Sequence, residues 1–240
     1  MKFVVNTHIS YRKPLLMFFE SVKDSDLKRE LWKNIIVVDN DVEKSAPRLV
    51  PLKEILDTDI EAKVVYVANE FNSYEYGSYN ILNIYDEYEL IKDDQYLMLH
   101  DTVLLQHNFY EIISAFFDNQ FKDKIIQYKA PSSNIRIIGR KHVKEYGSQY
   151  DRPFTKEEAI SLEIGEEIDG FSINDFYSFN EHEDTICLGK APRVGRKPIY
   201  TKSLRRRIIT MNEFGLEKYV LFGWRNEFSQ KKIERNILFY

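Results

Sequence analysis

The segment Ile35-Ile36-Val37-Val38-Asp39-Asn40 (IIVVDN, residues 35–40) determines the fold class that the sequence predicts. Its four aliphatic residues form a continuous run, as in a parallel strand buried on both faces, and the run ends abruptly at polar residues. Similar short apolar runs recur at residues 3–5, 63–67, 96–99 and 125–128, and apolar residues at helical spacing lie between several of them. This alternation is typical of βαβ units. The sequence therefore predicts an α/β fold with a mostly parallel sheet flanked by helices.

The pattern becomes less regular beyond about residue 130. Before that point, Asn108 and Glu111 predict the N-terminal cap of a helix whose apolar residues lie within 109–117. The chain has no linker rich in Gly, Ser or Pro and no internal repeat. We therefore expect one domain, 1–240, with a less regular C-terminal third.

The charges are distributed unevenly along the chain. The formal net charge is -4, but residues 151–187 carry 2 basic and 11 acidic side chains, and residues 188–240 carry 13 and 4. The overall acidity argues against a protein that binds nucleic acid over its whole surface. The single cysteine, Cys187, excludes a disulfide within the chain and fits a reducing compartment. The first residues are too polar for a signal peptide, and no apolar run approaches the ~20 residues of a membrane helix. The expected location is the cytoplasm, either free or peripherally attached to a membrane.

Polar residues follow four of the predicted strands, at the places where an open α/β sheet binds its ligands. These strand ends are Asn6-Thr7-His8, Asp39-Asn40-Asp41, Asn69-Glu70 and His100-Asp101-Thr102. Ordinary turn and capping chemistry is the alternative for each of them. The chain lacks Gly-x-Gly-x-x-Gly, a phosphate loop and Gly-x-Ser-x-Gly, which argues against a Rossmann dehydrogenase, a P-loop kinase and an α/β-hydrolase.

In their order and spacing, these segments resemble the GT-A fold glycosyltransferases, especially family-2-like and rhamnan-synthesis-type enzymes of polysaccharide assembly. The resemblance covers about residues 1–130 and rests on VVNTHISYR (4–12), IIVVDN (35–40), NEFNSYEYGSYN (69–80) and YLMLHDTVLL (96–105). It implies a GT-A-like, Rossmann-like fold in which residues 1–130 bind a nucleotide-diphosphate sugar and residues 131–240 bind the acceptor.

The resemblance also implies individual donor-site residues. Thr7 and Arg12 would line the nucleotide pocket, and Asp39 would accept a hydrogen bond from the base, which in the family is usually uracil, thymine or guanine. In the stretch 69–80, Asn69, Glu75 and Gly77 would lie near the nucleotide and the sugar, where glycine lets the backbone approach closely. A polar loop followed by a helix cap is the alternative for this stretch.

The fourth strand departs from the family pattern at its metal site. The family supplies two carboxylates to Mg²⁺ or Mn²⁺, which bridges the diphosphate, whereas the triplet His100-Asp101-Thr102 contains one. The resemblance implies that Asp101 binds the metal, with His100 as a second ligand that favours Mn²⁺. The alternatives are an enzyme that needs no metal and an ordinary strand end.

A run of cations without any acidic residue extends from Lys190 to Arg207. A departing nucleoside diphosphate must be stabilised by positive charge, so Arg205 and Arg206 are candidates for a diphosphate clamp. A patch that docks on anionic lipid or nucleic acid and a solvated basic face are the alternatives.

An inverting transferase needs a carboxylate base that deprotonates the acceptor hydroxyl. Glu183 and Asp184 resemble the Glu-Asp pair that family-2-like enzymes place in this part of the chain. Adjacent carboxylates raise one another's pKa, which suits a base. A solvated acidic loop is the alternative.

The sequence therefore predicts a glycosyltransferase of hexosyl- or deoxyhexosyltransferase type. It would move a sugar from a UDP, GDP or TDP donor to a glycan or a lipid-linked acceptor, with inversion favoured and no nucleic-acid partner. The alternative from another class is a noncatalytic α/β binding or assembly protein, a degenerate transferase that docks on an anionic partner through its basic C-terminal part.

Overall fold

The computed structural model of the chain describes residues 1–7, 12–39, 48–66, 75–87, 92–128, 135–148, 167–168, 171–172, 183–188, 199–201 and 204–222. The chain divides into two compact units. The first consists of Met1–Ile9, Arg29–His100 and Phe116–Ala191, and the second of Ser10–Lys28, Asp101–Ala115 and Pro192–Tyr240. Each unit is thus assembled from three separate stretches of chain, and the single domain expected over 1–240 stays a prediction.

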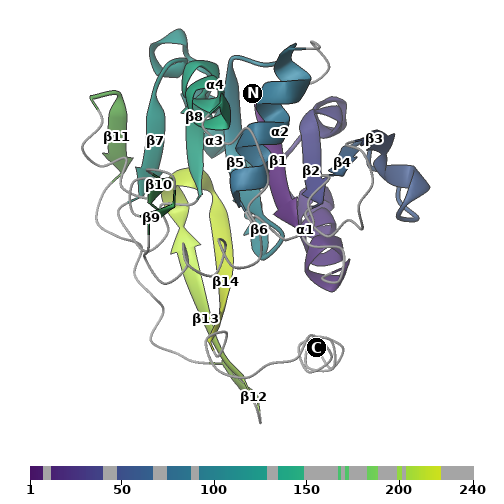
Figure 1. Ribbon diagram of the computed structural model, residues 1–240. Coiled ribbons are helices and arrows are strands. Elements are labelled where there is room, and N and C mark those ends of the chain that lie inside the picture. Colours follow the sequence, from purple (N-terminus) through teal and green to yellow (C-terminus); the bar gives the residue numbers. More distant parts are fainter. Residues whose placement is uncertain are drawn as a thin grey trace. The chain divides into compact units, whose positions relative to one another are not determined.

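The first unit contains an eight-stranded sheet with the order β11-β7-β8-β5-β1-β2-β4-β3 (Figure 1). Its strands are β1 (Lys2–Thr7), β2 (Ile35–Asp39), β3 (Arg48–Pro51), β4 (Lys63–Tyr66), β5 (Gln95–His100), β7 (Ile125–Tyr128), β8 (Arg136–Gly139) and β11 (Thr185–Leu188). The pairs β1–β2, β1–β5, β2–β4 and β7–β11 are parallel. Only β3 and β8 run the other way, since β8 is antiparallel to both β5 and β7, and β3 to β4. The predicted α/β fold with a mostly parallel sheet is confirmed.

Helices α2 (Glu75–Glu87) and α4 (Arg140–Ser148) cover one face of this sheet (Figure 1). The core beneath them consists of apolar side chains that alternate along the strands, as the period of two requires, together with Tyr79, Leu82 and Tyr85 of α2 and Val143 of α4. The strand residues of this core are Val4, Ile36, Val38, Val65, Tyr96, Met98, Ile125 and Ile138. The face that carries Val4 and Met98 is therefore the helix-covered face.

The other elements of the first unit are short. They are the 3-10 helices η2 (Arg29–Asn34), η3 (Leu52–Glu54) and η5 (Asn119–Phe121) and the two-residue strands β9 (Glu167–Ile168) and β10 (Phe171–Ser172), which pair with each other. A further 3-10 helix, η4 (Ser114–Phe117), lies at a boundary between the units, since Ala115 belongs to the second unit and Phe116 to the first.

The second unit contains an antiparallel four-stranded sheet with the order β12-β13-β14-β6. Its elements are α1 (Arg12–Asp24), β6 (Val103–Leu105), α3 (Phe109–Ile113), β12 (Ile199–Thr201), β13 (Leu204–Met211), η7 (Asn212–Phe214) and β14 (Leu216–Phe222). The backbone N–H of Leu105 donates to Ser21 Oγ at 3.0 Å and so joins α1 to β6.

The start of α3 is capped differently from the prediction. Asn108 occupies the N-cap position but its side chain makes no capping hydrogen bond. Instead, the carboxylate of Asp26 accepts hydrogen bonds from the backbone N–H groups of Tyr110 at 2.6 Å and Glu111 at 2.9 Å. The capping group comes from a residue 84 positions away, and such a partner leaves no local sequence signal.

No helix in the described ranges combines the length and the apolar character that a membrane-spanning segment needs.

Candidate functional site

The carboxyl ends of β1, β2, β4 and β5 meet at one edge of the first unit's sheet, which we call the carboxyl edge. There, Thr7 of β1 lies opposite Asp39 of β2, and Asp39 lies opposite Tyr66 at the end of β4. On the other side of β1, Asn6 lies opposite His100 of β5. The structure therefore brings Thr7, Asp39 and His100 to the same edge, although they come from three distant segments. Their roles as ligand contacts stay predictions.

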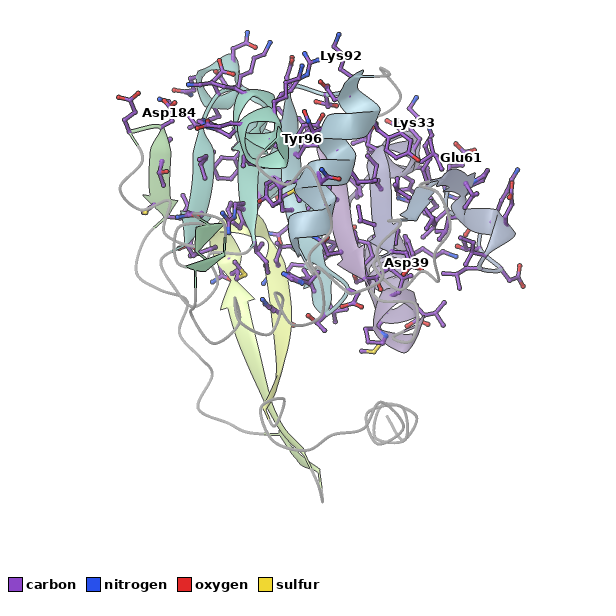
Figure 2. The ribbon with its side chains drawn as sticks, in the orientation of Figure 1. Lys33, Asp39, Glu61, Lys92, Tyr96 and Asp184 are labelled. Carbon is purple, nitrogen blue, oxygen red and sulfur yellow. The ribbon has the colours of Figure 1, made fainter. Side chains whose placement is uncertain are left out.

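Thr7 and Asp39 are buried, with 7% and 3% of their surface exposed. Figure 2 shows Asp39 at the end of its strand. An ionised carboxylate in such a place is costly unless it accepts hydrogen bonds. A buried carboxylate at this position therefore needs hydrogen-bond donors around it.

Asn6 joins three elements at the carboxyl edge. Its Nδ2 donates to the carbonyl oxygen of Leu99 on β5 at 3.2 Å, and its Oδ1 accepts a hydrogen bond from Ser78 Oγ on α2. Ser78 is fully buried. It lies at the end of the first turn of α2, the turn that begins at Glu75 and contains Gly77. The N-terminus of α2 therefore lies at the carboxyl edge, where the sequence analysis expected Glu75 and Gly77.

Glu183 and Asp184 lie at the opposite edge of the same sheet. Asp184 directly precedes β11, and β11 runs parallel to β7, so Asp184 lies at the amino ends of the parallel strands. Figure 2 shows Asp184 and Asp39 at opposite ends of the strands. The structure therefore does not bring these two acidic residues together with Thr7, Asp39 and His100.

Asp184 is held by two lysines. Its Oδ1 accepts a hydrogen bond from Lys124 Nζ at 2.8 Å, and its Oδ2 accepts one from Lys141 Nζ at 3.0 Å. Nε2 of the buried His142 lies 3.6 Å from the same Oδ2. The hydrogen bond from Lys124, followed by that from Lys141, holds the pKa of Asp184 well below its usual range. A carboxylate with a lowered pKa is a weak base, whereas Glu183 beside it is exposed.

The remaining predicted residues are placed only in part. Arg12 begins α1, and Arg205 and Arg206 lie on β13, but their side chains fall outside the described part of the structure. Asn69 lies outside the described residues altogether.

Within the second unit, Asp101 lies two residues before β6. Val103 of β6 pairs with Lys218 of β14, and two residues further along β14, Val220 pairs with Arg207 of β13. Asp101 therefore precedes β6 at the same end of this sheet at which β13 carries the three arginines 205–207.

Among the residues described, no group of three or more His, Cys, Asp or Glu side chains is arranged to hold a metal ion. The triplet His100-Asp101-Thr102 contributes a single carboxylate. These residues by themselves do not form a complete site for Mg²⁺, which prefers several oxygen ligands.

Two buried polar residues near the carboxyl edge, Gln127 of β7 and Arg136 of β8, were not predicted from the sequence. Both are fully buried and lie opposite each other, and Arg136 also lies opposite Met98, two residues before His100. A charged side chain within the apolar segment IRIIG (135–139) was the available signal, because arginine is rarely fully buried unless it is paired.

The fold and this edge define an α/β protein with a mixed, mostly parallel sheet and a polar carboxyl edge. No family model matches the sequence, and no curated protein matches it. Among solved structures, the chain is similar to S. aureus TarS, with 16% identity over 65% of this chain and 31% of that one, and a TM-score of 0.41. It is also similar to the glycosyltransferase GlyE in Streptococcus pneumoniae TIGR4, with 13% identity over 78% of this chain and 44% of that one, and a TM-score of 0.43.

The chain spans less than half the length of either of these two chains. Both likenesses concern the fold, and at these TM-scores neither adds to what the sheet topology itself shows.

Proposed function

We propose that the chain is a glycosyltransferase that binds a nucleotide-diphosphate sugar at the carboxyl edge and transfers the sugar to a glycan or lipid-linked acceptor. The observation that supports this proposal most is the arrangement of Thr7, Asp39 and His100 at one edge of the sheet. These residues come from three segments that resemble the donor-site segments of GT-A fold enzymes. The strand order brings them to one edge, with Thr7 and Asp39 paired on one face of the sheet and His100 on the other face.

In this proposal, Asp39 accepts a hydrogen bond from an N–H group of the base. Its burial strengthens the discrimination, since a buried acceptor that loses its donor is not compensated by water. UDP, GDP and TDP each present such an N–H group. The nucleotide is therefore proposed only as one of these three.

The diphosphate is proposed to lie near the first turn of α2, which the contact between Ser78 and Asn6 holds at the carboxyl edge. The N-terminus of a helix of 13 residues carries unpaired backbone N–H groups and a partial positive charge, both of which favour an anion. Arg12, Arg205 and Arg206 are proposed as further phosphate contacts on the basis of their charge.

Asp101, with His100, is proposed as the ligand of a Mn²⁺ or Mg²⁺ ion, and metal-independent transfer is the alternative. A bound divalent ion would neutralise charge on the leaving diphosphate. The described residues supply an incomplete set of ligands for this ion.

The base that deprotonates the acceptor was assigned to Glu183 or Asp184. This assignment stays a prediction, and the two lysine hydrogen bonds of Asp184 favour a structural role for that residue. Inversion at the anomeric carbon, the sugar type and a peripheral membrane contact are proposed on the resemblance alone.

The test is a calorimetric titration of the protein with UDP, GDP, TDP and their sugars, with and without Mn²⁺. We expect one of the nucleotides to bind and its sugar to be hydrolysed or transferred. Absence of binding by all of them at millimolar concentration would overturn the proposal.

A noncatalytic binding protein is the second candidate, and the single carboxylate of the triplet His100-Asp101-Thr102 favours it. Nucleotide binding without any turnover, or salt-sensitive binding to anionic vesicles without nucleotide affinity, would identify this second candidate.

A further inference from the structure

Helix α2 makes buried polar contacts with other elements at both of its ends. In its last turn, Asp86 accepts hydrogen bonds from Arg140 and Lys144 of α4. In its first turn, Ser78 donates to Asn6 of β1. Between these ends, the helix packs against the core through Tyr79 and Leu82. The contacts of Asp86 join α2 to α4, whereas the contact of Ser78 joins α2 to the carboxyl edge of the sheet.

The Asn6 amide has a fixed orientation. Its oxygen accepts from Ser78, its nitrogen donates to the carbonyl oxygen of Leu99, and the two partners belong to different elements. Asn6 is 5% exposed and Ser78 is fully buried, so water does not replace a bond that is lost. A rotation of the amide would break both bonds at once, and each buried group left without a partner is costly.

This contact determines where the first turn of α2 lies. Asn6 is the register partner of His100, so the serine that ends the turn is held near this predicted donor-site residue, whereas the side chain of Thr7 lies on the opposite face of the sheet. Gly77, immediately before Ser78, is fixed by the same bond through the backbone.

We propose that Asn6 and Ser78 are positioning residues of the donor site. They act through the first turn of α2, which they hold against the ends of β1 and β5, and they do not themselves contact the nucleotide. This inference rests on the proposed function, because it identifies residues on which the geometry of that same site depends.

The test compares Ser78→Ala with Asp86→Asn. Both changes remove a buried polar contact of α2, but only the first acts at the carboxyl edge, so Asp86→Asn is the matched control. We expect Ser78→Ala to weaken the binding of whichever of UDP, GDP and TDP binds best by about tenfold, the equivalent of one buried hydrogen bond. Asp86→Asn should lower the melting temperature and leave that affinity within about twofold. Affinity is measured at a temperature where all variants are folded.

The double variant Asn6→Ala, Ser78→Ala supplies a second criterion. Both single changes break the same bond, so the double variant should bind the nucleotide no more weakly than Asn6→Ala alone. Additive losses would overturn the proposal, because they would show that the two residues act separately.

Amide hydrogen exchange separates this inference from the proposed function. Ser78→Ala should accelerate the exchange of the amides of residues 79–82, and Asp86→Asn should not. If the wild-type protein binds none of the nucleotides, the proposed function is wrong. If Ser78→Ala leaves the exchange of residues 79–82 unchanged, the positioning role of Ser78 is wrong as well. If exchange accelerates while nucleotide affinity stays unchanged, the donor site does not depend on this turn, and the inference is wrong.

Discussion

The carboxylate of Asp86 accepts hydrogen bonds from Nε of Arg140 at 2.6 Å and from Nη2 of the same guanidinium at 2.9 Å. This two-pronged contact joins the last turn of α2 to the first turn of α4, and Lys144 Nζ adds a third contact at 2.9 Å. The Asp86 side chain is 2% exposed, whereas both cations reach solvent. Burial raises the pKa of Asp86, but the hydrogen bonds from Arg140 and Lys144 outweigh burial and bring the pKa below its ordinary value.

Asp86→Asn is therefore expected to lower the free energy of unfolding by roughly 2–4 kcal/mol at neutral pH. The asparagine cannot supply the negative charge that the two cations face. Urea unfolding measures the change. Asp59→Asn is the control, because the pair between Asp59 and Arg29 is exposed and is expected to contribute about 0.5 kcal/mol or less. Equal losses in the two variants would contradict this account.

The contact of Asp86 with Arg140 and Lys144 makes the free energy of unfolding depend on pH. Because the pKa of Asp86 is lowered in the folded state, its contribution is present above the pKa of the unfolded chain, about 3.9, and is lost as the pH falls through the lower folded value. Asp184 acts in the same direction. Acid unfolding of the Asp86→Asn variant should therefore depend less steeply on pH below about 4 than that of the wild-type protein.

Tyr96 is expected to produce the opposite dependence at alkaline pH. Burial raises the pKa of its hydroxyl to about 12, from an ordinary value of 10.0. The folded state thus keeps a proton that the unfolded chain loses, so stability should fall as the pH rises from 10 towards 12, with a slope of about 1.4 kcal/mol per pH unit from this group. Tyr96→Phe removes the titrating hydroxyl. The difference between the two urea-unfolding curves over this range isolates its contribution, and parallel curves would contradict the prediction.

Asp39→Asn keeps the shape of the side chain and removes its charge. If Asp39 accepts a hydrogen bond from the base, the variant should bind the nucleotide about tenfold more weakly or worse, because hydrogen bonds to charged groups contribute about 1.5–3 kcal/mol. Calorimetry measures the affinity, and circular dichroism checks the fold. Asp59→Asn serves again as the control. An unchanged affinity for the nucleotide would show that Asp39 does not bind the base.

Asp184→Asn and Glu183→Gln distinguish a structural carboxylate from a catalytic one. We expect Asp184→Asn to lower the melting temperature, since Lys124 and Lys141 then face each other without a counter-charge, and to keep both nucleotide binding and transfer. Glu183→Gln should leave the melting temperature unchanged. Loss of transfer in either variant, at a temperature where that variant is folded, would identify the base that the sequence predicts.

Five strands of the first unit's sheet, β1, β2, β4, β5 and β7, could be predicted from the sequence because each is a short, nearly continuous apolar run that ends at polar residues. The strands β3, β8 and β11 were not among the predicted runs. Thr7, Asp39 and His100 could be predicted for the same reason, since their position at a strand end is a local property of the sequence. We expected them at one edge because the carboxyl ends of parallel strands lie on the same side of a sheet.

The contacts that hold these elements in place could not be predicted. Ser78 meets Asn6 across 72 residues, Asp86 meets Arg140 across 54, and Asp184 meets Lys124 across 60. Which residues meet in these contacts depends on how the helices and strands pack, and the residues adjacent in sequence do not indicate it. The assignment of Asp184 as a base used the resemblance to a Glu-Asp pair of family-2-like enzymes and the adjacent Glu183, and neither of them indicates the two lysines that hold Asp184.

The interleaving of the two units determines when each can form during synthesis. The chain passes from one unit to the other five times, at residues 9–10, 28–29, 100–101, 115–116 and 191–192. The third stretch of the first unit ends at Ala191, and the last stretch of the second begins at Pro192. On the ribosome, the first unit lacks its third stretch until Ala191 has emerged, and the second lacks β13 and β14 until Phe222 has emerged. The early βα segments are therefore synthesised before the chain that completes their unit, and their apolar faces are exposed to aggregation at that stage.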